Sequence, residues 1–197
     1  GAPRKRTDNP GPDHQPTWTA DGKAVITRSI LEEGYESGKR RLMIWSTAVG
    51  EPIELTQGVD RHVFRYRLAP DGRSVIALMD GEGVWQLARL DLQQPGVVEE
   101  ITRGPSWVWD LDVASAAGTV VFEGTDAIHP SELFVLDAIP GPDAEPVPFT
   151  FANADGLRRL TGFNDGFVDG RLLSVPVRHW FEGSNARVES WYYPPST

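Results

Sequence analysis

The sequence predicts an all-β fold, a partial β-propeller of about three to four four-stranded antiparallel blades, and a repeated phrase is the main reason. The phrase TADGKAVI starts at Thr19, APDGRSVI starts at Ala69, and a degenerate copy, ASAAGTVV, starts at Ala114. Each copy is followed by further β-rich runs, and each unit then closes at a threonine. The closing residues are Thr56, Thr102 and Thr161. Four strands in a unit of about 40–50 residues are typical of a propeller blade.

The four strands of each predicted blade follow one another along the chain. A first strand is visible in RHVFRYRLAP (61–70), where apolar residues alternate with arginine. Second strands begin inside the repeated phrase, as in AVITRS (24–29) and SVIALM (74–79), where β-branched and apolar residues dominate. The third strands are the apolar runs RLMIWST (41–47), VWQLARLDL (84–92) and ELFVLD (132–137). The fourth strands end at the closing threonines.

The Asp-Gly pairs of the repeated phrase are predicted to form the turns between first and second strands. Glycine adopts a positive φ without steric cost, and aspartate tolerates one. Asp21 and Asp71 are therefore predicted turn residues, and a role as catalytic acids is the alternative. A further turn signal, Asp80-Gly81, precedes the third strand of the second blade.

Composition and charge exclude several classes of function. The 197 residues are 40% hydrophobic and 24% charged, as in ordinary globular proteins. The net charge of −9 argues against binding to nucleic acid or to anionic membrane surfaces, which need basic residues. The sequence has no cysteine, so it offers neither disulfides nor thiolate metal ligands, and no apolar run is long enough to span a membrane. The compartment stays open between cytoplasm and periplasm.

The blade phrases resemble those of the prolyl-oligopeptidase family of serine peptidases, in particular its acylaminoacyl-peptidase and dipeptidyl-peptidase branches. HPSELFVLD (129–137), followed by GLRRLTGFND (156–165), is similar to the last blade of those enzymes. ARVESWYYPPST (186–197) resembles the strand that enters their α/β-hydrolase domain, with Ser190 where the family has glycine. The resemblance covers residues 16–197 and implies a propeller that leads into such a domain.

The resemblance and the repeats together set the predicted domain boundaries. Residues 1–15 are a polar N-terminal segment, and 186–197 are the start of the α/β-hydrolase domain. The predicted blades are 16–58, 59–104, 105–162 and a partial fourth blade, 163–185.

No catalytic residue is predicted in this chain. The sequence contains no G-x-S-x-G, the sharp strand-turn-helix that exposes the nucleophilic serine of an α/β hydrolase. The Ser, His and Asp that the resemblance implies are therefore expected on a continuation of the chain or on a second polypeptide. The remaining propeller blades are expected there too.

Candidate substrate-binding residues follow from the meander topology. If Asp-Gly turns join first to second strands, loop 29–40 and the inter-blade links 57–62 and 103–108 share the opposite end of the sheets. In the family that the sequence resembles, this face looks toward the hydrolase active site. The candidates on these loops, and directly after the last of them, are Glu32, Glu33, Tyr35, Arg61, His62, Trp107 and Trp109.

Each candidate has a chemical reason and a structural alternative. A pair of carboxylates binds a peptide α-amino group, and an arginine binds a carboxylate or a carbonyl oxygen. Trp107 and Trp109 alternate, so one is expected to pack in the blade and the other to face the channel. For all of them, core packing or a solvated surface is the alternative. No cofactor or metal is predicted, because the four histidines have no metal-ligand spacing.

The favoured function is that of a propeller that gates a peptide and orients it over a Ser-His-Asp site outside this chain. The substrate class includes acylated peptides, dipeptide-releasing substrates and the side-chain amide of lasso peptides, which an isopeptidase opens. The alternative from another class is a non-catalytic binding or scaffold propeller of the periplasmic type. A propeller glycosidase or lactonase needs converging carboxylates, for which the first strands offer Asp110 and Asp112.

Overall fold

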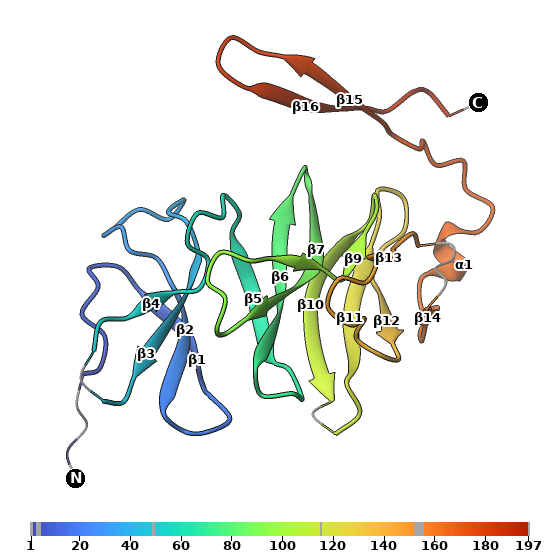
Figure 1. Cartoon of the computed structure of the whole chain (residues 1–197). Helices are drawn as coiled ribbons and strands as arrows, with labels where there is room; N and C mark the ends of the chain where they lie inside the picture. The colour runs from blue at the N-terminus through green and yellow to red at the C-terminus, as the bar shows by residue number, and fades with distance from the viewer. Residues whose placement is uncertain (1, 3–4, 49, 115, 152–155, 197) are drawn as a thin grey trace.

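Three four-stranded antiparallel sheets follow one another along the chain, as the repeated phrases predict (Figure 1). The computed structural model describes residues 2, 5–48, 50–114, 116–151 and 156–196. In each sheet the order of strands in space is their order in the chain, so each sheet is a meander. The predicted all-β partial propeller is thereby confirmed. Ser115, in the third copy of the repeated phrase, and Thr197, in the C-terminal phrase, lie outside the described residues.

The strand bounds place the three sheets in sequence. The first sheet contains β1 (Asp13–Trp18), β2 (Ala24–Ser29), β3 (Arg41–Ser46) and β4 (Ile53–Glu54). The second contains β5 (Val63–Leu68), β6 (Ser74–Gly81), β7 (Val84–Asp91) and β8 (Glu99–Glu100). The third contains β10 (Trp107–Ala114), β11 (Thr119–Thr125), β12 (Glu132–Leu136) and β14 (Leu157–Arg159). A short parallel ladder joins β9 (Thr102–Arg103) to β13 (Val147–Pro148).

The Asp-Gly pairs lie in the turns between first and second strands, as predicted, within loops 19–23 and 69–73. The carboxylate of Asp71 accepts the backbone N–H groups of Arg73 and Ser74, at 2.8 and 3.0 Å. The turn predicted at Asp80-Gly81 is misplaced by two residues. Those residues belong to β6, and the chain turns at Glu82 and Gly83, whose φ values are 46° and 74°. Two successive positive φ angles define the tight hairpin turn that matches the twist of antiparallel strands.

Gly72 is expected to be less replaceable than Gly22, although both have a positive φ, of 64° and 68°. A Cβ at Gly72 would lie 2.7 Å from the Cβ of Ala20 in the neighbouring turn, whereas nothing lies within 4 Å at Gly22. Gly22→Ala should cost about 1 kcal/mol of the free energy of unfolding through backbone strain alone. Gly72→Ala should cost roughly 1 kcal/mol more through overpacking. Urea denaturation of the two variants checks this, and equal midpoints would contradict the contact between turns.

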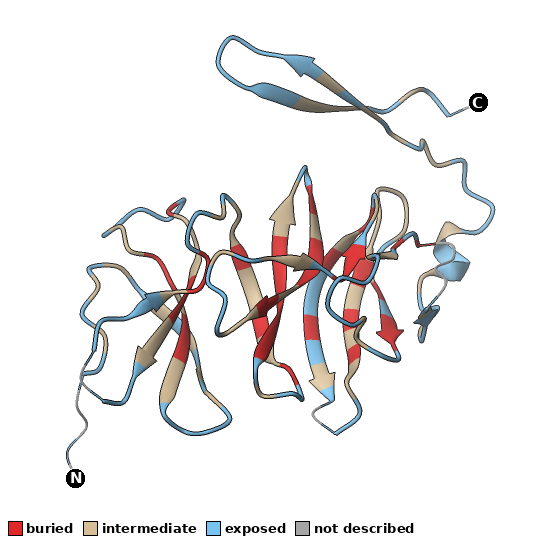
Figure 2. Ribbon diagram, viewed as in Figure 1, coloured by how far each residue is buried: buried red, intermediate tan, exposed pale blue. Residues whose placement is uncertain are grey.

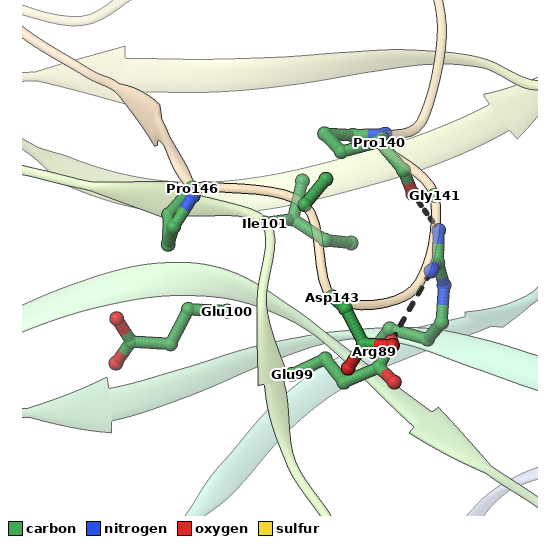
Figure 3. A pocket seen from close by; sticks show the side chains of 9 residues that line it. Arg89, Glu99, Glu100, Ile101, Pro140, Gly141, Asp143 and Pro146 are labelled. Carbon is green, nitrogen blue, oxygen red and sulfur yellow. Dashed lines mark hydrogen bonds and ion pairs between the residues drawn. The ribbon is translucent and has the colours of Figure 1, made fainter.

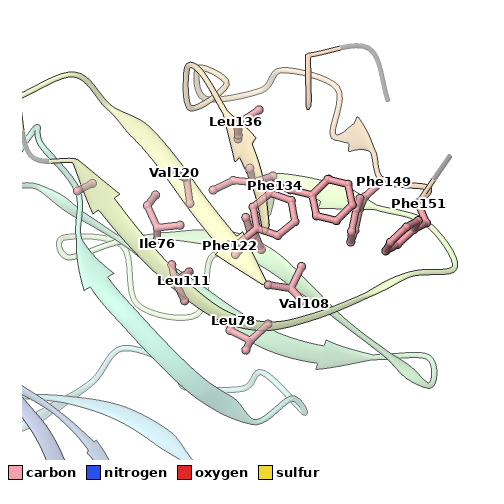
Figure 4. Packing of buried hydrophobic residues seen from close by; sticks show 13 residues of the cluster. Ile76, Leu78, Val108, Leu111, Val120, Phe122, Phe134, Leu136, Phe149 and Phe151 are labelled. Carbon is pink, nitrogen blue, oxygen red and sulfur yellow. The ribbon is translucent and has the colours of Figure 1, made fainter. Parts of the chain in front are cut away.

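Most of the core lies between the sheets. One apolar cluster joins the first and second sheets, and it includes Ile26, Leu42, Val75 and Met79. Tyr66 is buried in it and donates its hydroxyl to the carbonyl of Ile26 at 2.8 Å. A second cluster joins the second and third sheets (Figure 4). Figure 2 accordingly shows the strands of the second sheet as the most buried of the three.

The second cluster contains a segment that no repeat predicts. After β12 the chain doubles back, and Phe149 enters the space between the second and third sheets, where it is fully buried. Its ring centroid lies 5.2 Å from that of Phe122 and 5.1 Å from that of Phe134. A Cβ at Gly104 would lie 2.2 Å from the Phe149 carbonyl oxygen, and one at Gly124 would lie 2.5 Å from its ring. Gly124 therefore leaves room for the ring of Phe149, and Gly104 leaves room for its backbone.

Glu132 holds the chain where it leaves the third sheet. Its side chain is buried, and its carboxylate accepts hydrogen bonds from the Thr161 hydroxyl and from both the backbone and the side-chain N–H groups of Asn164. The two bonds from Asn164 measure 2.8 and 3.0 Å. The phrases HPSEL and LRRLTGFND are thus joined physically. The short helix α1 (Asp165–Val168) follows at once.

A hairpin near the C-terminus belongs to none of the three sheets. Its strands are β15 (Val177–Glu182) and β16 (Arg187–Tyr192), and they pair with each other alone among the described strands. Figure 1 shows the hairpin lying across one end of the sheets. The predicted boundary at 185/186 falls in its turn, between the two strands. That boundary and the partial blade 163–185 stay predictions.

Candidate functional site

Loop 29–40, the links 57–62 and 103–106 and the β6–β7 turn lie at one end of the sheets, which we call the link face (Figure 1). The Asp-Gly loops lie at the opposite end. The arrangement agrees with the meander argument, and the C-terminal hairpin lies over this same end. The link face is therefore where the sequence-predicted residues meet.

The carboxylates of loop 29–40 do not form a free pair. Glu32 forms an ion pair with Arg41 at 3.2 Å, and Arg41 also reaches Glu54 at 3.4 Å. The hydrogen bond from Arg41 holds the pKa of the Glu32 carboxyl below its usual value. Glu33 is exposed, and Tyr35 is 62% exposed at the tip of the loop. Tyr35 and Glu33 therefore present exposed side chains to a ligand, whereas Glu32 is engaged by Arg41.

Arg61 and His62 attach the first inter-blade link to the second sheet. The guanidinium of Arg61 donates to the carbonyl of Asp80 and lies 3.6 Å from the carboxylate of Glu100. The backbone N–H of His62 donates to the Asp80 carboxylate at 2.5 Å, and its Nδ1 accepts the backbone N–H of Arg40 at 3.3 Å. Both side chains thus have structural partners, although Arg61 also lines a cavity of about 540 Å³ beneath the hairpin.

Trp107 and Trp109 differ in their surroundings, and neither is fully buried. The indole N–H of Trp107 donates to the Gly83 carbonyl at 2.8 Å, and its ring lies 5.5 Å from that of Trp191 in the hairpin. Trp109 is 44% exposed, and its ring meets the ring of Trp85 edge-on at 4.6 Å. Trp107 therefore connects the link face to the hairpin, and Trp109 is the more exposed member of the pair.

An aromatic row runs across the link face, and sequence reasoning did not identify it. Phe64 stacks on Trp85 at 4.0 Å, Trp85 contacts Trp109, and the guanidinium of Arg40 lies 5.3 Å above the Phe64 ring. Phe64 and Trp109 sit at equivalent register shifts, in β5 and β10. A bulge of this kind re-aims a side chain. The signal was in the sequence, because HVFRYRL and WVWDLDV align residue for residue.

The same alignment explains Asp110 and Asp112. Arg65 lies 3.6 Å from Asp110, and Arg67 lies 2.9 Å from Asp112, so two ion pairs connect the inner strands of the second and third sheets. The hydrogen bond from Arg67 lowers the pKa of the Asp112 carboxyl. A propeller glycosidase requires carboxylates that converge on a common point. These two carboxylates pair with neighbouring arginines instead.

The hairpin contacts the link face through its own charges. Arg178 lies 3.5 Å from Glu82, in the β6–β7 turn, and 2.7 Å from Glu189 on the facing strand. A Cβ on Gly83 would lie 2.2 Å from the Glu189 carboxylate, so a glycine is needed where the turn meets the hairpin. A further cavity, of about 270 Å³, lies at the outer edge of the second sheet beside β8 (Figure 3). There Arg89 is occupied by Glu99 at 3.2 Å and by the Pro140 carbonyl.

Within the residues that the structure describes, no cluster of three or more histidine or acidic side chains is placed to hold a metal ion. Among these residues there is also no helix with the length and apolar character needed to span a membrane.

Comparisons with known proteins agree with the fold. No protein-family model matches the chain. Dipeptidyl-peptidase 5 of Porphyromonas gingivalis is 30% identical over 103 residues, which make up 52% of this chain and 15% of that protein. Acylaminoacyl peptidase of Pyrococcus horikoshii superposes with a TM-score of 0.65 and 21% identity, over 90% of this chain and 24% of that chain.

Two further structures extend the comparison. The β-propeller domain of the trilobed protease from Pyrococcus furiosus gives a TM-score of 0.51 and 25% identity, over 77% of this chain and 38% of that chain. A putative TolB from Agrobacterium tumefaciens gives 0.55 and 25%, over 70% of this chain and 49% of that one.

Fold and comparisons define the class of protein as a β-propeller segment. Its likeness to the propellers of peptidases, expected from the blade phrases, is confirmed by the matches to a dipeptidyl peptidase, an acylaminoacyl peptidase and a trilobed protease. The chain spans only 15% of the first of these proteins and 24% of the second.

Proposed function

We propose that this chain is the propeller part of a serine hydrolase that cleaves amide bonds of peptides. The link face gates the substrate and orients it over a Ser-His-Asp site in an α/β-hydrolase domain outside this chain. In that reaction the serine attacks the amide carbonyl, the amine leaves with a proton from the histidine, and water then releases the acyl group. This chain contributes access and orientation, and no catalytic group.

The hairpin β15–β16 is the observation that carries the proposal. It leaves the last sheet, pairs with none of the described blade strands and rests on the link face through Arg178 and Trp191. Several of its apolar side chains are 39–57% exposed. They are Val177, Phe181, Val188 and Tyr192. An exposed apolar surface of this kind suits a further domain packed above the link face.

The link face also suits a peptide. The aromatic row offers flat apolar surface, and the neighbouring arginines offer donors for carbonyl and carboxylate oxygens. Acylaminoacyl-peptidase-like or dipeptidyl-peptidase-like cleavage is the favoured mode. Opening the side-chain amide of a lasso peptide is the narrower option. Comparing the rates at which the full protein hydrolyses linear peptides and threaded lasso peptides distinguishes the two modes.

Labelling of the full protein with a fluorophosphonate tests the proposal. We expect one modified serine within a G-x-S-x-G sequence outside residues 1–197, and loss of peptide hydrolysis in proportion to labelling. A full protein in which no serine reacts would overturn the hydrolase proposal.

A non-catalytic binding or scaffold propeller of the periplasmic type is the second candidate. The similarity to the putative TolB, with a TM-score of 0.55, favours it. A protein of this kind would bind a partner and leave peptides intact, so the labelling experiment separates the two candidates.

A further inference from the structure

We propose that the pocket beside loop 29–40 is a carboxylate-binding subsite, in which Arg28 and Arg40 bind an anionic group of the peptide substrate. The identification of the ligand as a peptide rests on the proposed function. The preference for a carboxylate rests on the residues that line the pocket.

The pocket lies on the link face of the first sheet and has a volume of about 470 Å³. Pockets of about 300–1,000 Å³ are typical of small-ligand sites, so this one accommodates a side chain or a peptide terminus. The titratable groups that line it are His14, Arg28, Glu32, Tyr35, Glu36 and Arg40. Gly38 lets the loop fold closely over it, since a Cβ there would lie 2.6 Å from the Ile30 side chain.

Arg28 is held in the pocket and pairs with no carboxylate among the residues that the structure describes. One of its terminal nitrogens donates to the Phe64 carbonyl at 2.6 Å, which fixes the side chain across the gap between the first and second sheets. Its Nε is buried and has no acceptor among the described residues. A buried donor without an acceptor costs free energy that a bound ligand recovers.

The positive charge around Arg28 is not neutralised. Burial first, and then the charges of Arg40 and Arg65, lower the pKa of its guanidinium. Arg65 has Asp110 as a partner, whereas the side chain of Arg40 lies over the Phe64 ring and forms no ion pair within the described part of the chain. Of the two acidic groups in the lining, Glu32 is bound by Arg41, and Glu36 forms no ion pair with a described residue. With Glu32 paired to Arg41, Arg28 and Arg40 outweigh the charge of Glu36, and this cationic lining in a chain of charge −9 points to an anionic ligand.

A carboxylate fits this pocket better than a larger anion does. A guanidinium offers parallel donors in the geometry of a carboxylate, and such charge-assisted pairs are the stronger hydrogen bonds of proteins. The negative charge of the whole chain repels polyanions. Tyr35 lines the pocket, and the ring of Phe64 lies under the guanidinium of Arg40, so both offer apolar surface to the rest of a peptide. The carboxylate is either the C-terminus of the peptide or the side chain of Asp or Glu.

Fluorescence anisotropy on the full protein tests the subsite, with turnover stopped by a fluorophosphonate. The probes are Ala-Ala-Ala-Asp with an uncharged BODIPY dye on its N-terminus and its counterparts with Asn, with a C-terminal amide, and with both changes. We expect the doubly neutral peptide to bind about tenfold more weakly or worse, and the two singly neutral peptides to identify which carboxylate is bound. Arg28→Gln and Arg40→Gln should each weaken binding of the acidic peptide about tenfold and leave the doubly neutral peptide unchanged.

Arg73→Gln is the matched control, because Arg73 is an exposed arginine in the Asp-Gly loop of the second sheet, at the opposite end from the link face. Arg40→Gln keeps the test valid if Arg28→Gln misfolds. The described contact of the Arg40 side chain is with the Phe64 ring, so its replacement should disturb the fold less. Acidic-peptide affinity unchanged in both variants would overturn the subsite, and so would equal competition by inorganic phosphate, which would indicate a general anion site. Carboxylate-dependent binding without fluorophosphonate labelling would overturn the hydrolase proposal alone.

Discussion

Replacing Phe149 with alanine is expected to lower the free energy of unfolding by about 3–5 kcal/mol. The side chain is fully buried between the second and third sheets, in ring contact with Phe122 and Phe134. Gly124 approaches the ring, and Gly104 the backbone of Phe149, too closely for a side chain of their own, so the surrounding backbone is shaped around this residue. We expect the substitution to leave a cavity, because the second and third sheets on either side of Phe149 cannot move together to fill the space.

Urea denaturation followed by tryptophan fluorescence measures this loss. Phe163→Ala is the control, because Phe163 is 86% exposed and its loss should change stability by about 0.5 kcal/mol or less. If the two variants unfolded at the same urea concentration, Phe149 would not join the sheets as described.

Replacing Glu132 with alanine is expected to cost about 2–3 kcal/mol, the second largest effect. The change leaves the Thr161 hydroxyl and both N–H groups of Asn164 without their acceptor at the point where the chain leaves the third sheet. Glu132→Gln should cost less, because one amide oxygen remains to accept. Thermal unfolding of the two variants against the parent protein measures both losses.

The contribution of Glu132 should also depend on pH. Burial alone would raise the pKa of its carboxyl, but the hydrogen bonds from Thr161 and Asn164 outweigh burial and lower it. A carboxyl with a lowered folded-state pKa stabilises the fold above its unfolded pKa, about 4.3 for Glu, and loses this effect as pH falls through the folded value. The parent protein and Glu132→Gln should therefore differ most near neutral pH and converge in acid. A difference that stays constant with pH would contradict the network.

The repeated phrase was sufficient to predict three sheets, because hydrophobic runs and Asp-Gly turns are local signals. The turn at Glu82-Gly83 was misplaced by two residues, since DGEG contains two possible turn pairs and only pairing with β7 selects one. The burial of Phe149 had no local signal. It lies in a proline-rich segment that reads as a loop, and its position depends on room left by glycines that are distant in sequence.

The strand topology predicted which end of the sheets carries the candidate residues, but it did not predict the contacts that their side chains make. Arg61 and His62 lie on the predicted link, but ion pairs and backbone bonds to Asp80 and Glu100 use them structurally. Arg28 was not identified, because one arginine in a strand resembles any solvated residue until its partners are known. The pairing of Arg65 with Asp110 and of Arg67 with Asp112 could have been predicted, because these residues occupy equivalent positions when HVFRYRL and WVWDLDV are aligned.

A structure of the full protein, inactivated with a peptide chloromethyl ketone, would show where the hydrolase domain sits relative to this chain. We expect a hydrolase domain seated on the link face and the hairpin β15–β16, with the peptide enclosed between the reactive serine and the aromatic row. A catalytic domain at the Asp-Gly end of the sheets, or a hairpin that pairs into a fourth blade, would contradict this placement.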